Sequence, residues 1–104
     1  MPLQTDGIVV KNGGIRSIYF LLGIYCPPIA NQIKPGQFVM LKVSDDNSPI
    51  LRRPFSVYKS YPVSHPEKSK RGYLFILYKN VGKGTRKMTT WEKGQKVNLI
   101  GPLG

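Results

Sequence analysis

The sequence predicts a single domain of the mainly β class. Glycine and proline recur at short intervals along the 104 residues, and the segments between them are rich in β-branched and aromatic residues. We find no internal repeat, low-complexity segment or long linker. A chain of this length can bury about two-thirds of its unfolded surface, so it can hold a core of its own.

Six segments have the composition of β-strands, and turn-forming sequences separate them. The segments are residues 7–11, 18–26, 37–43, 54–60, 72–79 and 95–100. The expected breaks are Asn12-Gly13-Gly14, Pro27-Pro28, Asp45-Asp46-Asn47, Tyr61-Pro62 and Gly101-Pro102. Before the third strand, Pro35-Gly36 predicts a type II turn, because proline presets the first φ and glycine accepts the positive second one.

The third strand is apolar on both of its alternating faces over residues 38–43. Such a strand is covered on one side by the core and on the other by a ligand or a neighbouring domain. A closed barrel with a ligand on its outside fits this pattern. A sandwich fits it equally well, so the pattern leaves both architectures open.

One short helix is expected between the last two strands. Thr85 is expected to cap residues 86–91, Met88 and Trp91 would share one face, and Gly94 follows the end. A helix of about two turns needs packing to hold it. Residues 60–71 are expected to form an exposed loop, in which the single histidine, His65, is interpreted as solvated rather than catalytic.

The formal charge of +11 is concentrated in the second part of the chain. Residues 1–46 carry four basic and three acidic side chains, whereas residues 47–104 carry twelve basic and two acidic ones. This imbalance predicts attraction to a polyanion or an anionic cofactor, although a solvated lysine-rich face also explains it.

Composition excludes several classes of function. One cysteine, Cys26, and one histidine cannot form an internal disulfide, a zinc site or an iron–sulfur site, and a buried thiol in a reducing compartment is expected. The five acidic residues form no evident acid–base pair. No signal sequence and no apolar run of about 18 residues is present, so we expect a cytoplasmic protein with no membrane contact.

Two constellations have the chemistry of a phosphate site. In residues 51–57, Arg53, Pro54, Phe55 and Ser56 begin a strand, and alternation sends Arg53 and Phe55 to one face. Arginine can bind a pyrophosphate in bidentate fashion, and serine can hydrogen-bond the edge of a heteroaromatic ring. Taken alone, this motif is also explained by an arginine pair that solvates a strand end beside a core phenylalanine.

The second constellation is residues 77–85, which run from a strand through a glycine-rich turn into the expected helix. Gly82 and Gly84 allow the backbone to approach an anion closely, and the amides at a helix start favour phosphate. The Gly-Lys-Thr ending of a Walker loop is absent. A glycine-rich turn of this kind is weakly specific by itself.

Taken together, the motifs resemble the flavin domain of the ferredoxin reductase superfamily over essentially the whole chain. Those that carry the resemblance are, in order, residues 35–38, 52–57, 78–85 and 101–104. Within the superfamily, they are most similar to the electron-transfer subunits of two-subunit dihydroorotate dehydrogenases. The resemblance implies a six-stranded antiparallel Greek-key β-barrel with one short helix and FAD bound outside the barrel.

The resemblance also implies a set of cofactor-binding residues and no catalytic side chain or metal ligand of the protein. Arg53 would lie near the pyrophosphate, Phe55 against the flavin and Ser56 near the reactive ring edge. The full set comprises Arg53, Pro54, Phe55 and Ser56, then Leu77, Tyr78 and Lys79, and finally Gly84 and Thr85, which would bind pyrophosphate at the helix start. Many related domains have tyrosine where Phe55 stands, so flavin stacking would differ in detail.

By the same resemblance, residues 1–100 form the FAD-binding barrel and residues 101–104 begin a nicotinamide-binding domain that the sequence does not contain. A cysteine-rich tail for a [2Fe-2S] cluster is also missing, so NAD(P)H and the cluster would act only if further C-terminal regions exist. The implied activity is that of a flavin-dependent oxidoreductase, passing electrons between NAD(P)H and a catalytic dehydrogenase subunit or another electron-transfer partner. The 104 residues alone are expected to lack NAD(P)H oxidation.

Two alternatives remain open at this stage. The first is a hydrogenase-type or sulfide dehydrogenase-type reductase subunit with the same barrel. The second is a basic β-barrel that binds nucleic acid, because high positive charge and many aromatic residues also describe barrels that stack bases in a groove. The second alternative leaves the two phosphate motifs without a role, so nucleic acid is the less favoured partner.

Overall fold

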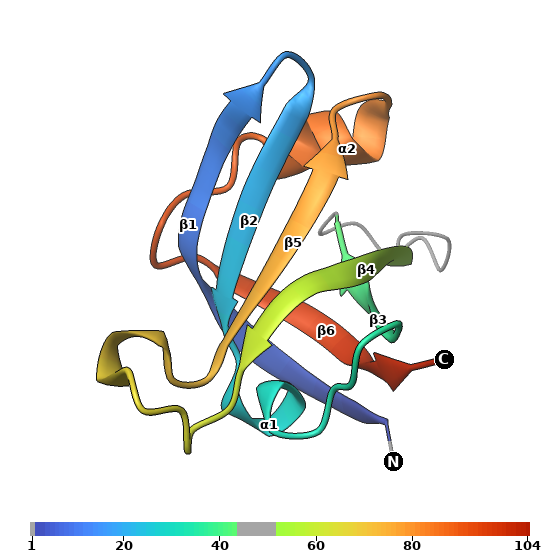
Figure 1. Ribbon diagram of the computed structural model, residues 1–104. Helices are drawn as coiled ribbons and strands as arrows, with labels where there is room; N and C mark the ends of the chain where they lie inside the picture. The colour runs from blue at the N-terminus through green and yellow to red at the C-terminus, as the bar shows by residue number, and fades with distance from the viewer. Residues whose placement is uncertain (1, 44–51) are drawn as a thin grey trace.

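The computed structural model describes residues 2–43 and 52–104, which form a closed antiparallel barrel of six strands (Figure 1). The strands are β1 (Leu3–Arg16), β2 (Tyr19–Tyr25), β3 (Phe38–Lys42), β4 (Arg52–Tyr61), β5 (Tyr73–Lys79) and β6 (Lys96–Leu103). Around the barrel they follow the order β1-β2-β5-β4-β3-β6. Since β2 lies beside β5 rather than β3, the connection is a Greek key. The predicted mainly β class and six-stranded barrel are confirmed.

Alternating apolar side chains fill the inside of the barrel, as strand periodicity requires. On β2 and β5, for example, Leu22, Ile24, Leu74 and Ile76 are fully buried. The remaining core residues are Val9, Cys26, Ile29, Ala30, Val39, Leu41, Val43, Tyr78, Met88, Trp91, Val97 and Leu99. The expectation of a buried thiol at Cys26 is confirmed, and burial raises the pKa of that thiol.

Two expected strand breaks are wrong. The segment Asn12-Gly13-Gly14 stays in β1, because its residues pair with Leu22, Leu21 and Phe20 of β2. Likewise, Gly101 and Leu103 belong to β6, where they pair with Leu3 and Phe38. In both places strand pairing outweighs the local preference of glycine and proline. The expected break at Asp45-Asp46-Asn47 lies outside the described residues.

The turn before β3 is as predicted. The amide of Gln37 donates to the carbonyl of Lys34 at 3.1 Å, and Gly36 has φ +89°, which a type II turn requires at this position. The expected break at Pro27-Pro28 is confirmed, because β2 ends at Tyr25, and the two prolines occupy the first turn of a short helix, α1 (Pro27–Ala30), where no amide donor is needed. The expectation of a single helix was therefore incomplete.

The expected helix near residue 85 begins earlier, as α2 (Lys83–Met88). Met88 and Trp91 are both buried against the barrel, but Trp91 lies beyond the end of α2, so the expectation that the two share a face of one helix is wrong. Asn12 of β1 holds this end of the helix in place. Its side-chain amide donates to the carbonyls of Met88 at 2.7 Å and Trp91 at 3.0 Å, and its oxygen accepts the hydroxyl of Tyr78 at 2.9 Å.

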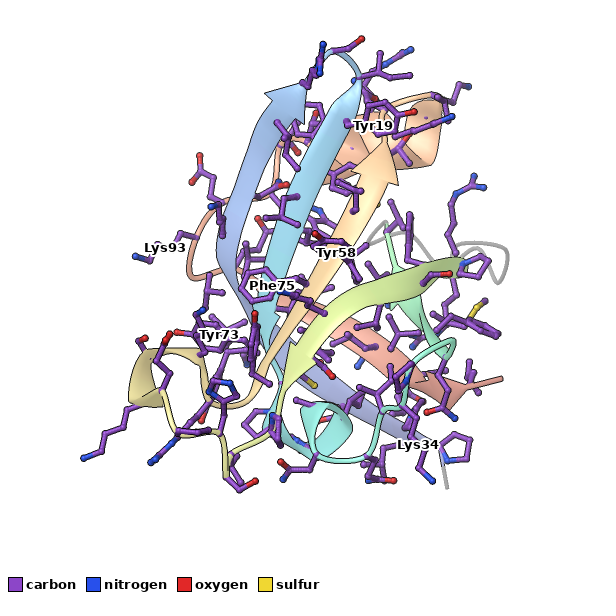
Figure 2. All side chains as sticks on the ribbon, viewed as in Figure 1. Tyr19, Lys34, Tyr58, Tyr73, Phe75 and Lys93 are labelled. Atoms are coloured by element: carbon purple, nitrogen blue, oxygen red, sulfur yellow. The ribbon has the colours of Figure 1, made fainter. Side chains whose placement is uncertain are left out.

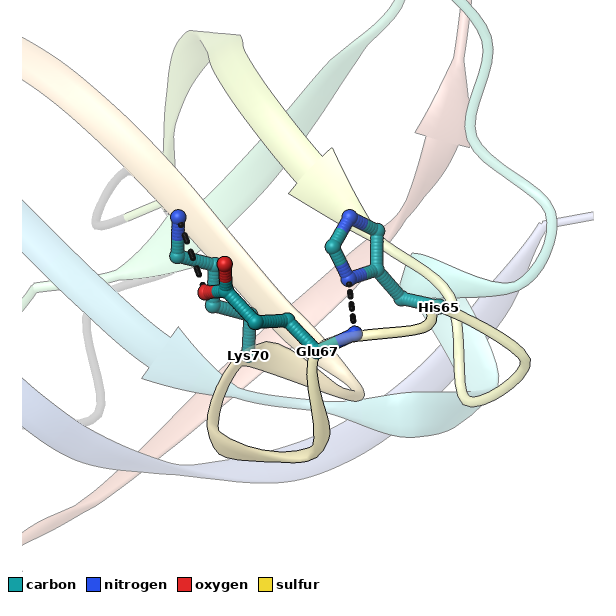
Figure 3. Close-up of polar contacts among 3 residues, drawn as sticks. All are labelled: His65, Glu67 and Lys70. Atoms are coloured by element: carbon teal, nitrogen blue, oxygen red, sulfur yellow. Dashed lines mark hydrogen bonds and ion pairs between the residues drawn. The ribbon is translucent and has the colours of Figure 1, made fainter.

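The connection between β4 and β5 is the expected loop, but it begins after Tyr61 because Ser60 and Tyr61 belong to β4, and it contains a 3-10 turn at Lys68–Lys70. His65 is half-buried rather than fully solvated. Its Nδ1 accepts the amide of Glu67 at 3.1 Å, and its ring meets that of Tyr61 edge-on at 4.9 Å between centroids. Glu67 pairs in turn with Lys70 at 3.2 Å (Figure 3). These contacts organise the loop, and the exposed ion pair adds little to stability.

The structure excludes two features within its described ranges. Over residues 2–43 and 52–104, no helix has the length and apolar character needed to cross a bilayer. Across the same ranges, no three side chains of histidine, cysteine, aspartate or glutamate gather into a possible metal site.

We predict that Asn12→Ala lowers the free energy of unfolding by about 1–3 kcal/mol, because it leaves the carbonyls of Met88 and Trp91 and the hydroxyl of Tyr78 without their partner. Urea unfolding followed by tryptophan fluorescence measures the loss. The matched control is Asn31→Ala, which removes one exposed hydrogen bond to the amide of Val63. An equal effect of both substitutions would show that Asn12 has no special role.

Candidate functional site

The candidate site is formed where β4 and β5 separate. Their ladder joins Tyr61 to Tyr73 at one end and stops at the pair of Val57 and Ile76. Beyond this point, the first half of β4 pairs with β3, and the last residues of β5 pair with β2. Figure 1 shows the two strands diverging toward α2. We use the name β4–β5 cleft for the part of the barrel wall between residues 52–56 of β4 and residues 77–79 of β5, where the two strands are no longer paired with each other.

The predicted cofactor contacts all lie around this cleft. Residues 53–56 are on the β4 side, residues 77–79 are on the β5 side, and Gly84 and Thr85 are in the helix that follows β5. Among the described ladders, residues 52–56 of β4 pair only with β3, and residues 77–79 of β5 pair only with β2. Each strand therefore has one edge here without a ladder partner. An edge of this kind can offer hydrogen bonds to a bound molecule.

Arg53 and the start of α2 come into direct contact. An ideal Cβ atom built on Gly84 would lie only 2.5 Å from Nε of Arg53 and 3.1 Å from its Cδ. Glycine at position 84 therefore leaves room for the arginine side chain to lie across the helix start. Arg53 remains exposed to solvent. The two motifs with phosphate chemistry thus meet at one place in the fold.

The side chains of β4 divide between the two faces as alternation predicts. Arg53 and Phe55 stand opposite the buried residues Leu41 and Val39 of β3, so both are on the inner face. Phe55 packs against the core and meets Tyr78 edge-on, with ring centroids 6.3 Å apart. Pro54 and Ser56 are exposed on the outer face. Here an aromatic ring and a hydroxyl flank the cleft from opposite faces of one strand.

The three predicted residues of β5 also alternate. Leu77 is 43% exposed, and Lys79 is exposed with its ammonium 5.5 Å from the ring centroid of Tyr19. Tyr78 is 3% exposed and points into the barrel, where its hydroxyl donates to Asn12. The phenol of Tyr78 therefore supports the wall of the cleft from inside.

Thr85 is not the N-cap that the sequence predicted. The N-cap is Gly82, and Thr85 is the third residue of α2. Its hydroxyl oxygen accepts the amides of Val81 at 2.9 Å and Gly82 at 3.0 Å, and the hydroxyl donates to the Gly82 carbonyl at 3.2 Å. These three hydrogen bonds hold the turn between β5 and α2 in place and occupy the Thr85 hydroxyl. A ligand at the helix start would meet its backbone before its hydroxyl.

Sequence reasoning missed Asn12, which determines where α2 and Tyr78 lie. In the sequence it precedes two glycines and reads as a turn residue. The only available signal is its place next to a strand rich in β-branched residues. Its three partners are 66–79 residues away, so no local pattern reveals them.

Comparison with solved structures defines the class of domain. No family model matches the chain. The NADH-dependent reduced ferredoxin-NADP oxidoreductase aligns with a TM-score of 0.76 and 25% identity, over 94% of this chain and 34% of that one. The ferredoxin reductase of carbazole 1,9a-dioxygenase aligns with a TM-score of 0.75 and 18% identity, over 99% of this chain and 29% of that one. The chain has the barrel of ferredoxin reductase-like domains.

Curated relatives make the relationship more specific. Three relatives named dihydroorotate dehydrogenase B (NAD(+)), electron transfer subunit, illustrate it. That of Desulforamulus reducens is 42% identical over 78 residues, which are 75% of this chain and 27% of the relative. Those of Lysinibacillus sphaericus and Bacillus cereus are 38% and 32% identical over all 104 residues, which cover 37% and 38% of the relatives.

The chain is a homologue of the dihydroorotate dehydrogenase B electron transfer subunits. The resemblance inferred from the sequence motifs is thereby confirmed. The chain spans about a third of the length of these curated relatives, from 27% to 38%.

We predict that Tyr78 adds a pH dependence to stability. Burial raises its pKa to about 12, and the hydrogen bond to Asn12 lowers the pKa by less. In the unfolded chain, tyrosine ionises near pH 10. Between about pH 10 and 12 the unfolded state therefore loses a proton that the folded state retains, so the free energy of unfolding falls as the pH rises.

Unfolding by urea at several pH values, with and without Tyr78→Phe, measures this effect. The wild type should lose more stability than Tyr78→Phe between pH 10 and 12, and little difference in slope should remain between pH 7 and 9. Parallel curves for the two proteins above pH 10 would contradict the burial argument.

Proposed function

We propose that the chain is the FAD-binding domain of an electron-transfer subunit, passing electrons between NAD(P)H and a catalytic dihydroorotate dehydrogenase subunit. The observation that supports this best is the contact between Arg53 and the start of α2 beside the β4–β5 cleft. Homology with dihydroorotate dehydrogenase B electron transfer subunits supports the class of reaction.

The residues around the cleft fit a flavin dinucleotide in charge. The pyrophosphate of FAD carries about two negative charges, which cations near the site attract. Arg53, Lys79 and Lys83 are exposed around the diverging strands and the start of α2. Arg53 would bind the pyrophosphate, and the backbone at Gly84 and Thr85 would approach it closely.

The residues also fit the flavin ring in shape and polarity. The exposed, apolar Leu77 would meet the ring, the exposed hydroxyl of Ser56 can hydrogen-bond the ring edge, and the half-buried Phe55 would support this part of β4 from the inner face. Pro54 holds this part of β4 rigid. Tyr78 would act from the core, by holding β5 in position.

Bound FAD would supply the redox chemistry, as cofactors of this class do. The chain would supply position and electrostatics. Arg53 would hold the diphosphate, and the strands would exclude water from one face of the ring.

The nicotinamide site is proposed to belong to a further domain, because the curated relatives are about three times longer than the chain. Residues 101–104 would lead into that domain. A [2Fe-2S] cluster would likewise need ligands from outside this sequence, which has one cysteine. The domain alone would therefore bind FAD without oxidising NAD(P)H.

We predict that Arg53→Ala weakens FAD binding by about 1.5–3 kcal/mol, the usual scale for losing a hydrogen bond to a charged group. Titration of FAD, followed by the shift of its absorption band and the quenching of its fluorescence, measures the affinity. Arg71→Ala is the matched control, because Arg71 lies in the loop after β4 and contacts His65 instead. Equal affinities of wild type and Arg53→Ala would remove Arg53 from the site.

We predict opposite effects of Gly84→Ala on stability and on FAD binding. Alanine is favoured over glycine within a helix, so the free energy of unfolding should stay equal or rise by up to about 1 kcal/mol. The new Cβ would force the Arg53 side chain away from the helix start, so FAD affinity should fall. Thermal unfolding without FAD and FAD titration test the two parts. Undiminished affinity would show that this contact does not shape the site.

A further inference from the structure

An apolar groove lies on the outside of the barrel, next to the β4–β5 cleft. It has a volume of about 380 Å³, and its walls come from four strands. The lining residues are Ile15, Arg16, Tyr19, Leu21, Tyr58 and Leu77. Figure 2 labels Tyr19 and Tyr58 over the sheet of β2, β5 and β4. Leu77 belongs to both the groove and the cleft, so the two surfaces are continuous.

The groove exposes four large apolar or aromatic side chains. Tyr58 is 61% exposed, Ile15 57%, Leu77 43% and Tyr19 38%. Contiguous apolar patches on a protein surface commonly mark an interaction site. Single exposed hydrophobic residues are common, but these four lie together in one concave surface.

A β-bulge directs Tyr58 into this surface. The register between β4 and β5 shifts between Val57 and Lys59, so Tyr58 is the extra residue of β4. Tyr58 and Lys59 are both exposed, whereas regular alternation would bury one of them. Bulges often re-aim a side chain next to a functional site. Here the bulge also coincides with the point where β4 leaves β5.

The charges around the groove are basic. Arg16 lines it, Lys79 lies over the ring of Tyr19, and Lys59 follows Tyr58. The described acidic residues lie elsewhere. Asp6 accepts a hydrogen bond from Asn98 on the β1–β6 side, Glu67 is in the loop after β4, and Glu92 follows α2. An occupant of this groove should therefore combine apolar groups with negative charge.

We propose that the catalytic dehydrogenase subunit docks in this groove, through apolar side chains surrounded by carboxylates. This inference rests on the proposed function, which supplies the partner. Docking here would bring the partner next to Leu77 at the edge of the cleft. A second copy of the chain is disfavoured, because two such basic surfaces, each on a chain of net charge +11, repel one another.

Nucleic acid is also disfavoured as the occupant. Base stacking needs a free aromatic face, and the ring of Tyr19 carries the ammonium of Lys79 at 5.5 Å, which leaves Tyr58 as the one unobstructed ring among the lining residues. Aliphatic side chains, Ile15, Leu21 and Leu77, form most of the remaining wall. Such a wall suits the side chains of a protein better than the bases of a polynucleotide.

The test is calorimetric titration of the chain with the catalytic dihydroorotate dehydrogenase subunit encoded in the same genome. Tyr58→Asp should lower the affinity at least about tenfold, as expected for loss of a central aromatic anchor, and Tyr58→Ala should lower it in the same direction. The matched control is Val63→Asp, which adds the same charge at a residue that is 47% exposed in the loop after β4. Its affinity should equal that of the wild type. Added salt should weaken wild-type binding.

FAD titration of every variant separates this proposal from the proposed function. The docking site alone is overturned if FAD still binds but Tyr58→Asp leaves the affinity for the catalytic subunit unchanged. It is likewise overturned if FAD binds but the wild type does not bind the catalytic subunit at all. Failure of the wild type to bind FAD overturns the proposed function. Titration with a single-stranded oligothymidine provides the remaining outcome: oligonucleotide binding that Tyr58→Asp abolishes and Val63→Asp retains would assign the groove to nucleic acid and overturn the proposal.

Discussion

The candidate site depends on one constraint, which is that β4 serves two different neighbours. Its first half completes the ladder with β3, and its second half completes the ladder with β5. The bulge at Tyr58 lies at the change of partner. Because β4 does not pair with β5 along its whole length, residues 52–56 and 77–79 each keep one edge without a ladder partner, although the barrel as a whole is closed. Both the β4–β5 cleft and the apolar groove follow from this separation.

A second interaction determines what closes the cleft at one end. Asn12 connects β1, β5 and the last turn of α2 through three hydrogen bonds. A six-residue helix has little stability by itself, so its position comes from Asn12 and from the burial of Met88 and Trp91. The position of Gly84 against Arg53 depends in turn on that anchoring. Residues in the core thus determine the geometry of a surface site.

The sequence predicted the class, the barrel through its resemblance, and the meeting of two distant motifs. The class follows from alternation and turn chemistry, which are local, whereas the barrel follows from the resemblance of motifs that are spread over the chain. It failed where long-range pairing overrides local preference, as at Asn12-Gly13-Gly14 and Gly101-Pro102, which remain within strands. It also assigned the cap of α2 to Thr85 rather than Gly82, because a hydroxyl three residues into a helix and one at its start look alike in sequence. The apolar groove could not be foreseen, since its walls come from strands far apart in the chain.

Closure of the barrel joins its first strand to its last, with Leu3 opposite Gly101. During synthesis on the ribosome, β1 is made first and β6 last, so β1 cannot pair with β6 until nearly the whole domain has been synthesised. Contacts of such long sequence separation slow folding, and an unpaired strand edge invites aggregation in the meantime. The same edge carries the polar side chains Gln4 and Asp6, which later bond Asn98 of β6. Polar side chains along the unpaired edge of β1 disfavour pairing with other chains until β6 has been synthesised.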